Sequence, residues 1–348
     1  MIMQIKNCFL REQAFFYESN LSIILAKNVY VKSWRKILLV DRRSSNLKFN
    51  TNKIKEITMK LRYIFLLLFL TLTLFSESYI IIDLDKGAKT DLEAMVKDFS
   101  NNDIIFFGEH HDSKVLHKLE REILPLMMKY YNDFAVSMEM FERDVQSALN
   151  SYLENAISEE EMLKKTRAWH NYKTAYKPII EFSKENNIDV IAANVPRRYA
   201  SKISKLGPSI LEKLGKKERK YVADSLVVMD DGYKKKFIKT MKDNHMMSGK
   251  MSKMINMDWL YAAQCIKDDT MAESIDNYYR NNNKKIIHFN GVFHSADHLG
   301  TAQKLKIMNN NLSIAIITPI KLEDAKPSIN AIDLKKNNKN DFIILYKE

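Results

Sequence analysis

The sequence predicts an α/β protein, in which a parallel β-sheet is flanked by helices and carries a smaller, all-helical subdomain. Two observations support this prediction. Short apolar runs alternate with amphipathic stretches from Tyr79 onward, and no such run lies between Asn194 and Lys284. Strands that are apolar on both faces and separated by helices are typical of a covered parallel sheet, because antiparallel strands more often alternate in polarity. The apolar fraction of 46% and the charged fraction of 28% are those of an ordinary globular chain.

Five apolar runs are the predicted strands of this sheet, and a sixth run near the end of the chain is predicted as an edge strand. The helix after the first strand is expected to begin at Ser113, because Leu119, Ile123 and Met127 then repeat at helical spacing. The five runs are Asp103–Phe107, Phe134–Met138, Asp189–Ala193, Lys285–Asn290 and Leu312–Thr318, and the sixth is Phe342–Tyr346.

The helical subdomain is expected over about residues 197–284, where Lys and Met are frequent. We interpret it as an insertion into the α/β domain, which then spans residues 79–348. Its predicted helices are Ala200–Leu214, Glu218–Val228, Tyr233–Asn244 and Met257–Tyr279.

Residues 59–78 have the pattern of a secretory signal peptide. Lys60 and Arg62 precede an apolar run at 64–75, and Ser76 and Ser78 suit the cleavage positions. The run has about 12 residues, fewer than the roughly 20 that a transmembrane helix requires. Because a signal peptide stands at the start of its protein, we interpret residues 1–58 as a mis-annotated extension that precedes a true start at Met59. The alternative is a genuine N-terminal arm followed by a short buried or re-entrant helix.

The mature protein is therefore expected in the periplasm or elsewhere in the cell envelope. No cysteine lies near Ser78, so a lipid anchor is not supported, and Cys265 is the single cysteine after that point. Residues 1–58 hold 11 of the 55 Lys and Arg, and from Tyr79 onward the net charge is +4 instead of +12. This balance is ordinary, and we expect no binding to nucleic acid.

Two similar motifs follow predicted strands and carry the candidate chemistry. Gly108-Glu109-His110-His111 follows the first strand, and Gly291-Val292-Phe293-His294 follows the fourth. In an open parallel sheet the carboxyl ends of the strands meet at one crevice, where a glycine lets the backbone turn sharply. We therefore expect Glu109, His111 and His294 to converge with Glu139 and Arg197, which also lie at or just beyond strand ends.

This set of side chains is typical of a site for a divalent metal ion, with Glu as a general base and Arg on a developing oxyanion. The same groups are equally compatible with a buried ion network that has no catalytic role. For His111 and His294 individually, a buried histidine with a hydrogen-bond partner is the ordinary alternative.

These residues, with others, resemble the ChaN-like haem-binding uptake proteins, which are related to the Tiki, TraB and erythromycin-esterase-like proteins. The resemblance covers about Asp103 to Thr318. It rests on Gly108-Glu109-x-His111-Asp112 with His117, Met138-Glu139-Met140-Phe141-x-Arg143-Asp144-x-Gln146, Trp169 through Tyr176 and Pro178, Asn194 to Arg198, Ala262-Ala263-Gln264 through Asp269-x-Met271-Ala272, and Gly291-x-x-His294. Relatives of this kind are often lipoproteins, and the missing cysteine is a departure from that pattern.

The resemblance implies two cofacial haems held between two monomers, each iron bound by a tyrosine and the propionates held by His and Lys of the other subunit. Haem then drives formation of a homodimer, and an outer-membrane haem receptor is the implied partner. Tyr233 and Tyr261 are the favoured iron ligands, because Tyr233, Lys242 and His245 lie on one predicted helical stretch and Tyr261 on the next. The other tyrosines of the region are Tyr172, Tyr176 and Tyr221.

Two functions thus remain open. The first is a haem-binding protein of bacterial iron acquisition, in which Tyr233, Tyr261, His245, Tyr176 and Lys242 are the candidate haem-binding residues. The second is a metal-dependent hydrolase or protease that uses the crevice of the sheet. A purely structural role is a third alternative, which would leave the crevice groups paired with one another.

Overall fold

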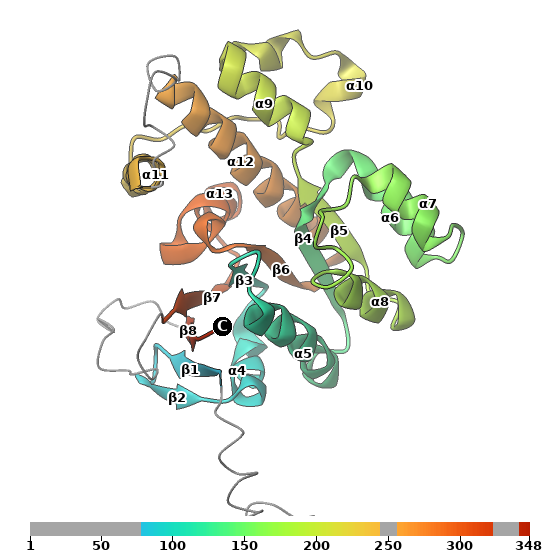
Figure 1. Cartoon of the computed structure of the whole chain (residues 1–348), viewed down its shortest axis with the longest axis vertical. Helices are drawn as coiled ribbons and strands as arrows, with labels where there is room; N and C mark the ends of the chain where they lie inside the picture. Colours follow the sequence, from blue (N-terminus) through green and yellow to red (C-terminus); the bar gives the residue numbers. More distant parts are fainter. Residues whose placement is uncertain (1–77, 244–255, 323–340) are drawn as a thin grey trace, which may run out of the picture. The chain divides into compact units, whose positions relative to one another are not determined.

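A mostly parallel eight-stranded sheet is the centre of the fold (Figure 1). The computed structural model describes residues 78–243, 256–322 and 341–348. The strand order is β2-β1-β8-β7-β3-β6-β4-β5, with β1 antiparallel to both β2 and β8 and all other neighbours parallel. The strands are β1 (Tyr79–Asp83), β2 (Ala88–Thr90), β3 (Ile104–Glu109), β4 (Phe134–Glu142), β5 (Val190–Asn194), β6 (Lys285–Gly291), β7 (Ile314–Lys321) and β8 (Phe342–Tyr346).

Helices cover both faces of this sheet. They are α4 (Leu92–Asp98), α5 (Lys114–Tyr130), α6 (Gln146–Leu153), α7 (Glu159–Thr166), α8 (Lys177–Glu185), α9 (Arg197–Leu206), α10 (Lys216–Arg219), α11 (Gly232–Asp243), α12 (Met257–Asn282) and α13 (Gly300–Met308). Among the described residues, no helix is both long and apolar enough to cross a membrane.

Alternation along each central strand divides the core into two layers. In β3, Ile105 and Phe107 belong to the apolar cluster under α4 to α8, whereas Ile104 and Phe106 belong to the cluster under α12 and α13. All four side chains are fully buried, as expected for strands covered on both faces. The predicted α/β class is confirmed, and the antiparallel β1–β2 edge adds to the parallel sheet.

Helix α5 shows how the sequence places functional groups on this scaffold. It begins where predicted, because the Ser113 hydroxyl accepts a hydrogen bond from the Leu116 amide at 3.2 Å and caps the first turn. Its buried face carries Leu119 and Ile123, and the same face also buries His117 and Glu120. Helix α5 packs on the sheet through its apolar residues, and this packing places His117 and Glu120 near the end of β3.

The chain between β5 and β6 is helical, and the long helix α12 connects it to the sheet. The second half of α12 packs on the sheet through Met271 and Ile275. Its first half packs on α9 and α11, where Tyr233, Phe237 and Tyr261 form a separate small core.

Three predictions about elements were wrong in detail. Strand β8 is not an edge strand, because it lies between β1 and β7. The helix predicted over Ala200–Leu214 ends at Leu206, since Gly207 adopts a φ of +85° and a 3₁₀ turn follows. Of the helix predicted over Glu218–Val228, only Glu218 and Arg219 are helical, as the end of the short helix α10.

The segment after α10 is irregular because side chains of α12 and α13 bind its backbone. Thr270 accepts a hydrogen bond from the Ala223 amide at 3.1 Å, and Asp269 accepts one from the Val227 amide at 2.9 Å. Lys304 donates to the Val227 carbonyl. These bonds replace the ones that a helix would supply. Residues 1–58, the predicted signal peptide up to residue 77, and His245 lie outside the described residues.

Candidate functional site

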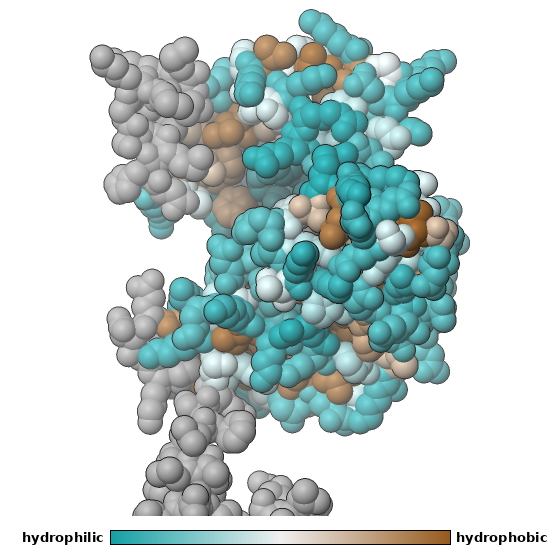
Figure 2. Space-filling model, turned by 45° about the vertical axis from the view of Figure 1, so that its right-hand side comes forward, coloured by the Kyte–Doolittle hydropathy of each residue, from teal (hydrophilic) through white to brown (hydrophobic). Residues whose placement is uncertain are grey.

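A pocket of about 920 Å³ lies at the carboxyl ends of the parallel strands. Ligand pockets commonly have volumes of about 300 to 1,000 Å³, and in α/β sheets they form at this edge. Glu109, His111, Glu139, Arg197 and His294 all line it. The structure therefore brings together the five crevice residues that the sequence predicted to converge. Most of the face drawn in Figure 2 is hydrophilic, and apolar residues appear on it in separate patches.

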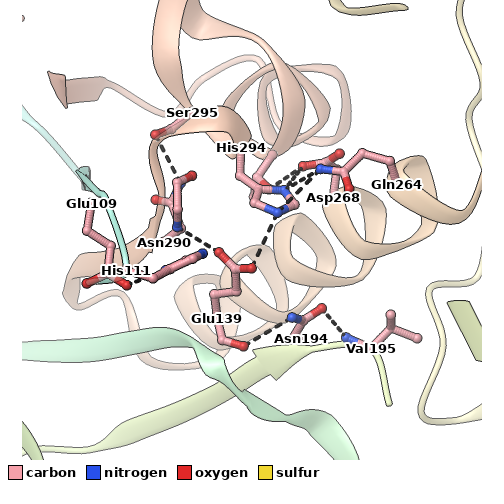
Figure 3. A network of polar contacts seen from close by, with 12 residues as sticks. Glu109, His111, Glu139, Asn194, Val195, Gln264, Asp268, Asn290, His294 and Ser295 are labelled. Atoms are coloured by element: carbon pink, nitrogen blue, oxygen red, sulfur yellow. Dashed lines mark hydrogen bonds and ion pairs between the residues drawn. The ribbon is translucent and has the colours of Figure 1, made fainter. Parts of the chain in front are cut away.

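The end of β6 holds two of these side chains close together. The Gly291 amide donates a hydrogen bond to Glu139 Oε2 at 2.7 Å. A Cβ atom at Gly291 would lie 2.8 Å from two ring atoms of His111, so a side chain there would displace the imidazole. Figure 3 shows the side chains of His111 and Glu139 pointing toward the backbone beside Asn290. The glycine therefore leaves room for the imidazole beside the end of β6.

Glu109 is a fully buried carboxylate that orients His111. Its Oε1 atom lies 2.6 Å from His111 Nδ1 and accepts a hydrogen bond from the Tyr176 hydroxyl at 2.7 Å. Burial alone would raise the pKa of Glu109, but the hydrogen bond with His111 and the nearby His117 and Glu120 side chains outweigh it and keep that pKa below its usual range. In the same way, burial would lower the pKa of His111 and the carboxylates of Glu109 and Glu139 raise it. His111 therefore presents Nε2 toward the pocket while Nδ1 is held by Glu109.

His294 is held between two carboxylates (Figure 3). Its Nδ1 atom lies 2.7 Å from Asp268 Oδ1, and its Nε2 atom lies 3.4 Å from Glu139 Oε1. Burial would lower the pKa of His294, but the charges of Glu139 and Asp268 raise it to about 10. At neutral pH this side chain is an imidazolium, and its positive charge helps to hold the pKa of Glu139 low against the effect of burial.

Asp268 is in turn positioned by the helical region. Tyr233 donates a hydrogen bond to Asp268 Oδ2 at 2.8 Å, and Thr301 donates one to Oδ1 at 2.9 Å. Gln264, one turn earlier on α12, lies 3.1 Å from the Tyr233 hydroxyl and reaches the ring of His294. The sequence analysis did not single out Asp268 and Gln264 as site residues, although both lie in the stretch from Gln264 through Asp269 that carries part of the family resemblance.

The remaining predicted residues lie in different surroundings. Arg197 is exposed on the rim of the pocket, where its backbone amide donates to Glu142 Oε1 at 2.9 Å. Tyr176 is buried behind Glu109, and Lys242 is exposed on α11.

Both favoured tyrosines are buried in the small core between α11 and α12. The exposed fraction is 0% for Tyr233 and for Tyr261, and neither lines the pocket. The Tyr233 hydroxyl is bonded to Asp268, whereas the Tyr261 hydroxyl has no hydrogen-bond partner among the described residues. Burial raises the pKa of both phenols.

We compared the chain with known protein families and with solved structures. A family model described as haem-binding uptake, Tiki superfamily, ChaN matches residues 95–305. ChaN of Campylobacter jejuni, solved with cofacial haem binding, has a TM-score of 0.58 and 18% identity, and the match covers 78% of this chain and 98% of that one. No curated protein sequence matches the chain.

Two other solved structures are more distant. An erythromycin esterase variant in its open conformation has a TM-score of 0.40 and 13% identity, covering 70% of this chain and 77% of that one. The RRSP toxin effector domain of Vibrio vulnificus has a TM-score of 0.34 and 14% identity, covering 62% of this chain and 34% of that one.

Proposed function

The chain belongs to the haem-binding uptake family of the Tiki superfamily that includes ChaN, and we propose on that basis that it binds haem in bacterial iron acquisition. The match over residues 95–305 is the observation that carries this proposal. It spans the whole set of strands β3 to β6 and the helices between them.

The pocket has a wall that suits a porphyrin. Phe237 and Met241 of α11 line it together with Phe293 and Trp169, which supply apolar and aromatic surface. Lys267 lines the same pocket, and a cation beside an apolar wall can hold a propionate while the porphyrin ring packs on the apolar side chains. Lys242 is exposed on α11 and lines a separate small pocket with Ile238 and Lys239.

The proposed iron ligand is a phenolate from Tyr233 or Tyr261, with two haems held between two copies of the chain. Tyrosine ligation suits ferric haem. Of the two, Tyr261 has the unpartnered hydroxyl, so its ligation would leave the Asp268–His294 network intact, whereas ligation by Tyr233 would remove a hydrogen bond from Asp268. Either ligand requires α11 to move relative to α12, because both rings are buried.

The test is a titration of the purified haem-free protein with hemin, followed by absorbance and sedimentation together. We expect saturable binding with one haem per chain, a tyrosinate-type high-spin spectrum and a shift from monomer to dimer. Replacing the ligating tyrosine, in Y233F or Y261F, should weaken hemin binding by about tenfold or more. The matched control is Y172F, which, like Y261F, removes a buried hydroxyl without a hydrogen-bond partner among the described residues but packs in the core on the α4–α8 face of the sheet. Absence of saturable binding, or equal weakening in all three variants, would contradict the proposal.

We also propose that the protein is exported and that an outer-membrane haem receptor is its partner. The support is the signal-like pattern of residues 59–78 and the family's role in uptake. Fractionation of cells that express the full reading frame, with N-terminal sequencing, is the direct check. We expect an envelope protein that begins near Tyr79.

A second candidate function is hydrolysis in the crevice, and the paired imidazoles and carboxylates favour it. His111 with Glu109, and His294 with Asp268, face the same pocket from two strand ends. Groups with strongly shifted pKa values in a cleft are typical of acid–base sites. Turnover of an ester or peptide that is lost in H111A, and in the presence of a chelator, would support this function over a purely haem-binding one.

A further inference from the structure

Behind Glu109, on the side away from the pocket, lies a second group of polar side chains that the haem proposal does not use. Glu120 and His117 project from the buried face of α5 toward Glu109 at the end of β3. One ligand atom from each of the three residues lies within 4.8 Å of the other two. The exposed fractions are 1% for Glu109, 7% for His117 and 0% for Glu120.

Four polar atoms of this group lack a hydrogen-bond partner among the described residues. Neither carboxylate oxygen of Glu120 has a hydrogen-bond partner among the described residues, and the same is true of Glu109 Oε2 and His117 Nε2. A buried carboxylate without a partner costs several kcal/mol, so such groups are normally paired, protonated or bound to a metal ion. Four unpartnered atoms that face one another therefore require an explanation.

Two occupants fit this group, a proton on Glu120 or a cation shared by the three side chains. Burial and the neighbouring Glu109 carboxylate raise the pKa of Glu120 well above its usual range, so a bound cation would displace a proton from Glu120. His117 Nε2 lies 3.2 Å from Glu109 Oε2, yet the two atoms are not aligned as donor and acceptor. A separation near 3.3 Å is what two ligands of one tetrahedral zinc ion show when each lies about 2.0 Å from the metal.

We propose that Glu109, His117 and Glu120 bind a divalent cation of the zinc class behind the pocket. One imidazole nitrogen and two carboxylate oxygens are ligands that such ions accept, and two carboxylates balance the double positive charge. Three protein ligands leave a coordination position for water. Because Glu109 would bind the cation through Oε2 and hold His111 through Oε1, the cation would fix the orientation of a pocket-facing imidazole.

The test uses the haem-free full chain, stripped of metal by dialysis against a chelator and then titrated with Co²⁺. Cobalt replaces zinc in N/O sites and reports its coordination by visible absorbance. We expect one tightly bound Co²⁺ per chain, displaced by Zn²⁺. In E120Q, the amide keeps the size of the side chain and removes its charge, and the dissociation constant should rise by at least about tenfold.

The matched control is E122Q on the same helix, because Glu122 is exposed and pairs only with Lys118 in the described residues. Co²⁺ binding of E122Q should equal that of the unmodified chain. H117Q serves as the second variant and should weaken binding as E120Q does. Hemin titration of E120Q separates the two proposals, since loss of the cation should leave saturable haem binding in place. If the unmodified chain binds no Co²⁺ or Zn²⁺, or if E120Q and H117Q bind as tightly as E122Q, the proposed cation site is wrong.

Discussion

At the scale of single residues, two buried histidines at and near this site differ because their neighbours differ. Burial lowers the pKa of His288 to about 3, and the hydrogen bond of this ring among the described residues is with the neutral Ser137 hydroxyl at 2.8 Å. His294 is equally buried, but Asp268 and Glu139 raise its pKa to about 10. The sequence motif identified His294 as a site residue and did not reveal its charge, because Asp268 approaches from a helix 26 residues away in the chain.

Replacing Asp268 tests this charge assignment. Because the folded pKa of His294 lies above the unfolded value of 6.5, its contribution to stability is complete below about pH 6.5 and is lost as the pH rises toward 10. In D268N we expect the His294 pKa to fall by about one to three pH units. The decrease in the free energy of unfolding between pH 7 and pH 9 should then be smaller than in the unmodified chain. NMR titration of the His294 ring and urea unfolding at the two pH values measure the two effects.

The control for D268N is T301V, which removes a hydrogen bond to the same carboxylate oxygen and leaves its charge in place. T301V should keep the pH dependence of the unmodified chain. An unchanged His294 titration in D268N would show that Asp268 does not set the charge of the imidazole.

At the scale of elements, six of the eight described strands were predicted from the sequence, whereas β1, β2 and the irregular segment after α10 were not. Strand β3 has apolar residues on both faces, and its short length with β-branched and aromatic side chains favours a covered strand over a buried helix. The residues after α10 have an amphipathic pattern as well, but Asp269 and Lys304 bind the backbone around Val227 and hold it out of a helix. Those two partners lie on α12 and α13, so no local pattern of the segment itself contains the reason.

The turn after β6 provides a prediction at this scale. In G291A the new Cβ would lie 2.8 Å from two ring atoms of His111, and the strand end or the imidazole must shift. Overpacking in a core typically costs about 1 to 3 kcal/mol, and the cost here should lie near the lower end because the half-exposed imidazole can move. We expect a loss of that size in the free energy of unfolding in urea, together with a changed NMR environment of His111. The control is G215A, because a Cβ at Gly215 would meet nothing within 4 Å. Equal stability of G291A and G215A would show that this turn tolerates a side chain.

At the scale of the whole molecule, the two ends of the described chain complete the sheet together. Strand β8 pairs with β1 on one side and with β7 on the other, over five residues each. Its last residue, Tyr346, lines the pocket and its hydroxyl lies 2.7 Å from His110 Nδ1. The sequence predicted β8 as a strand but placed it at the edge, because β1 directly follows the signal-like segment and did not stand out as a strand. Pairing between strands more than 250 residues apart cannot be read from either segment alone.

Deletion of residues 341–348 therefore removes an internal strand rather than a tail. All five residues of β8 are buried, and Phe342 and Ile344 belong to the main core. Loss of a large buried apolar side chain costs about 2 to 5 kcal/mol, and a native domain has only about 5 to 15 kcal/mol in total. We expect the shortened chain to lose its cooperative unfolding transition in urea, measured by circular dichroism. A chain that lacks only Lys347 and Glu348 keeps the whole of β8 and should unfold almost as the unmodified chain does. A cooperative transition retained after removal of residues 341–348 would mean that β1 and β7 stay folded without the strand between them.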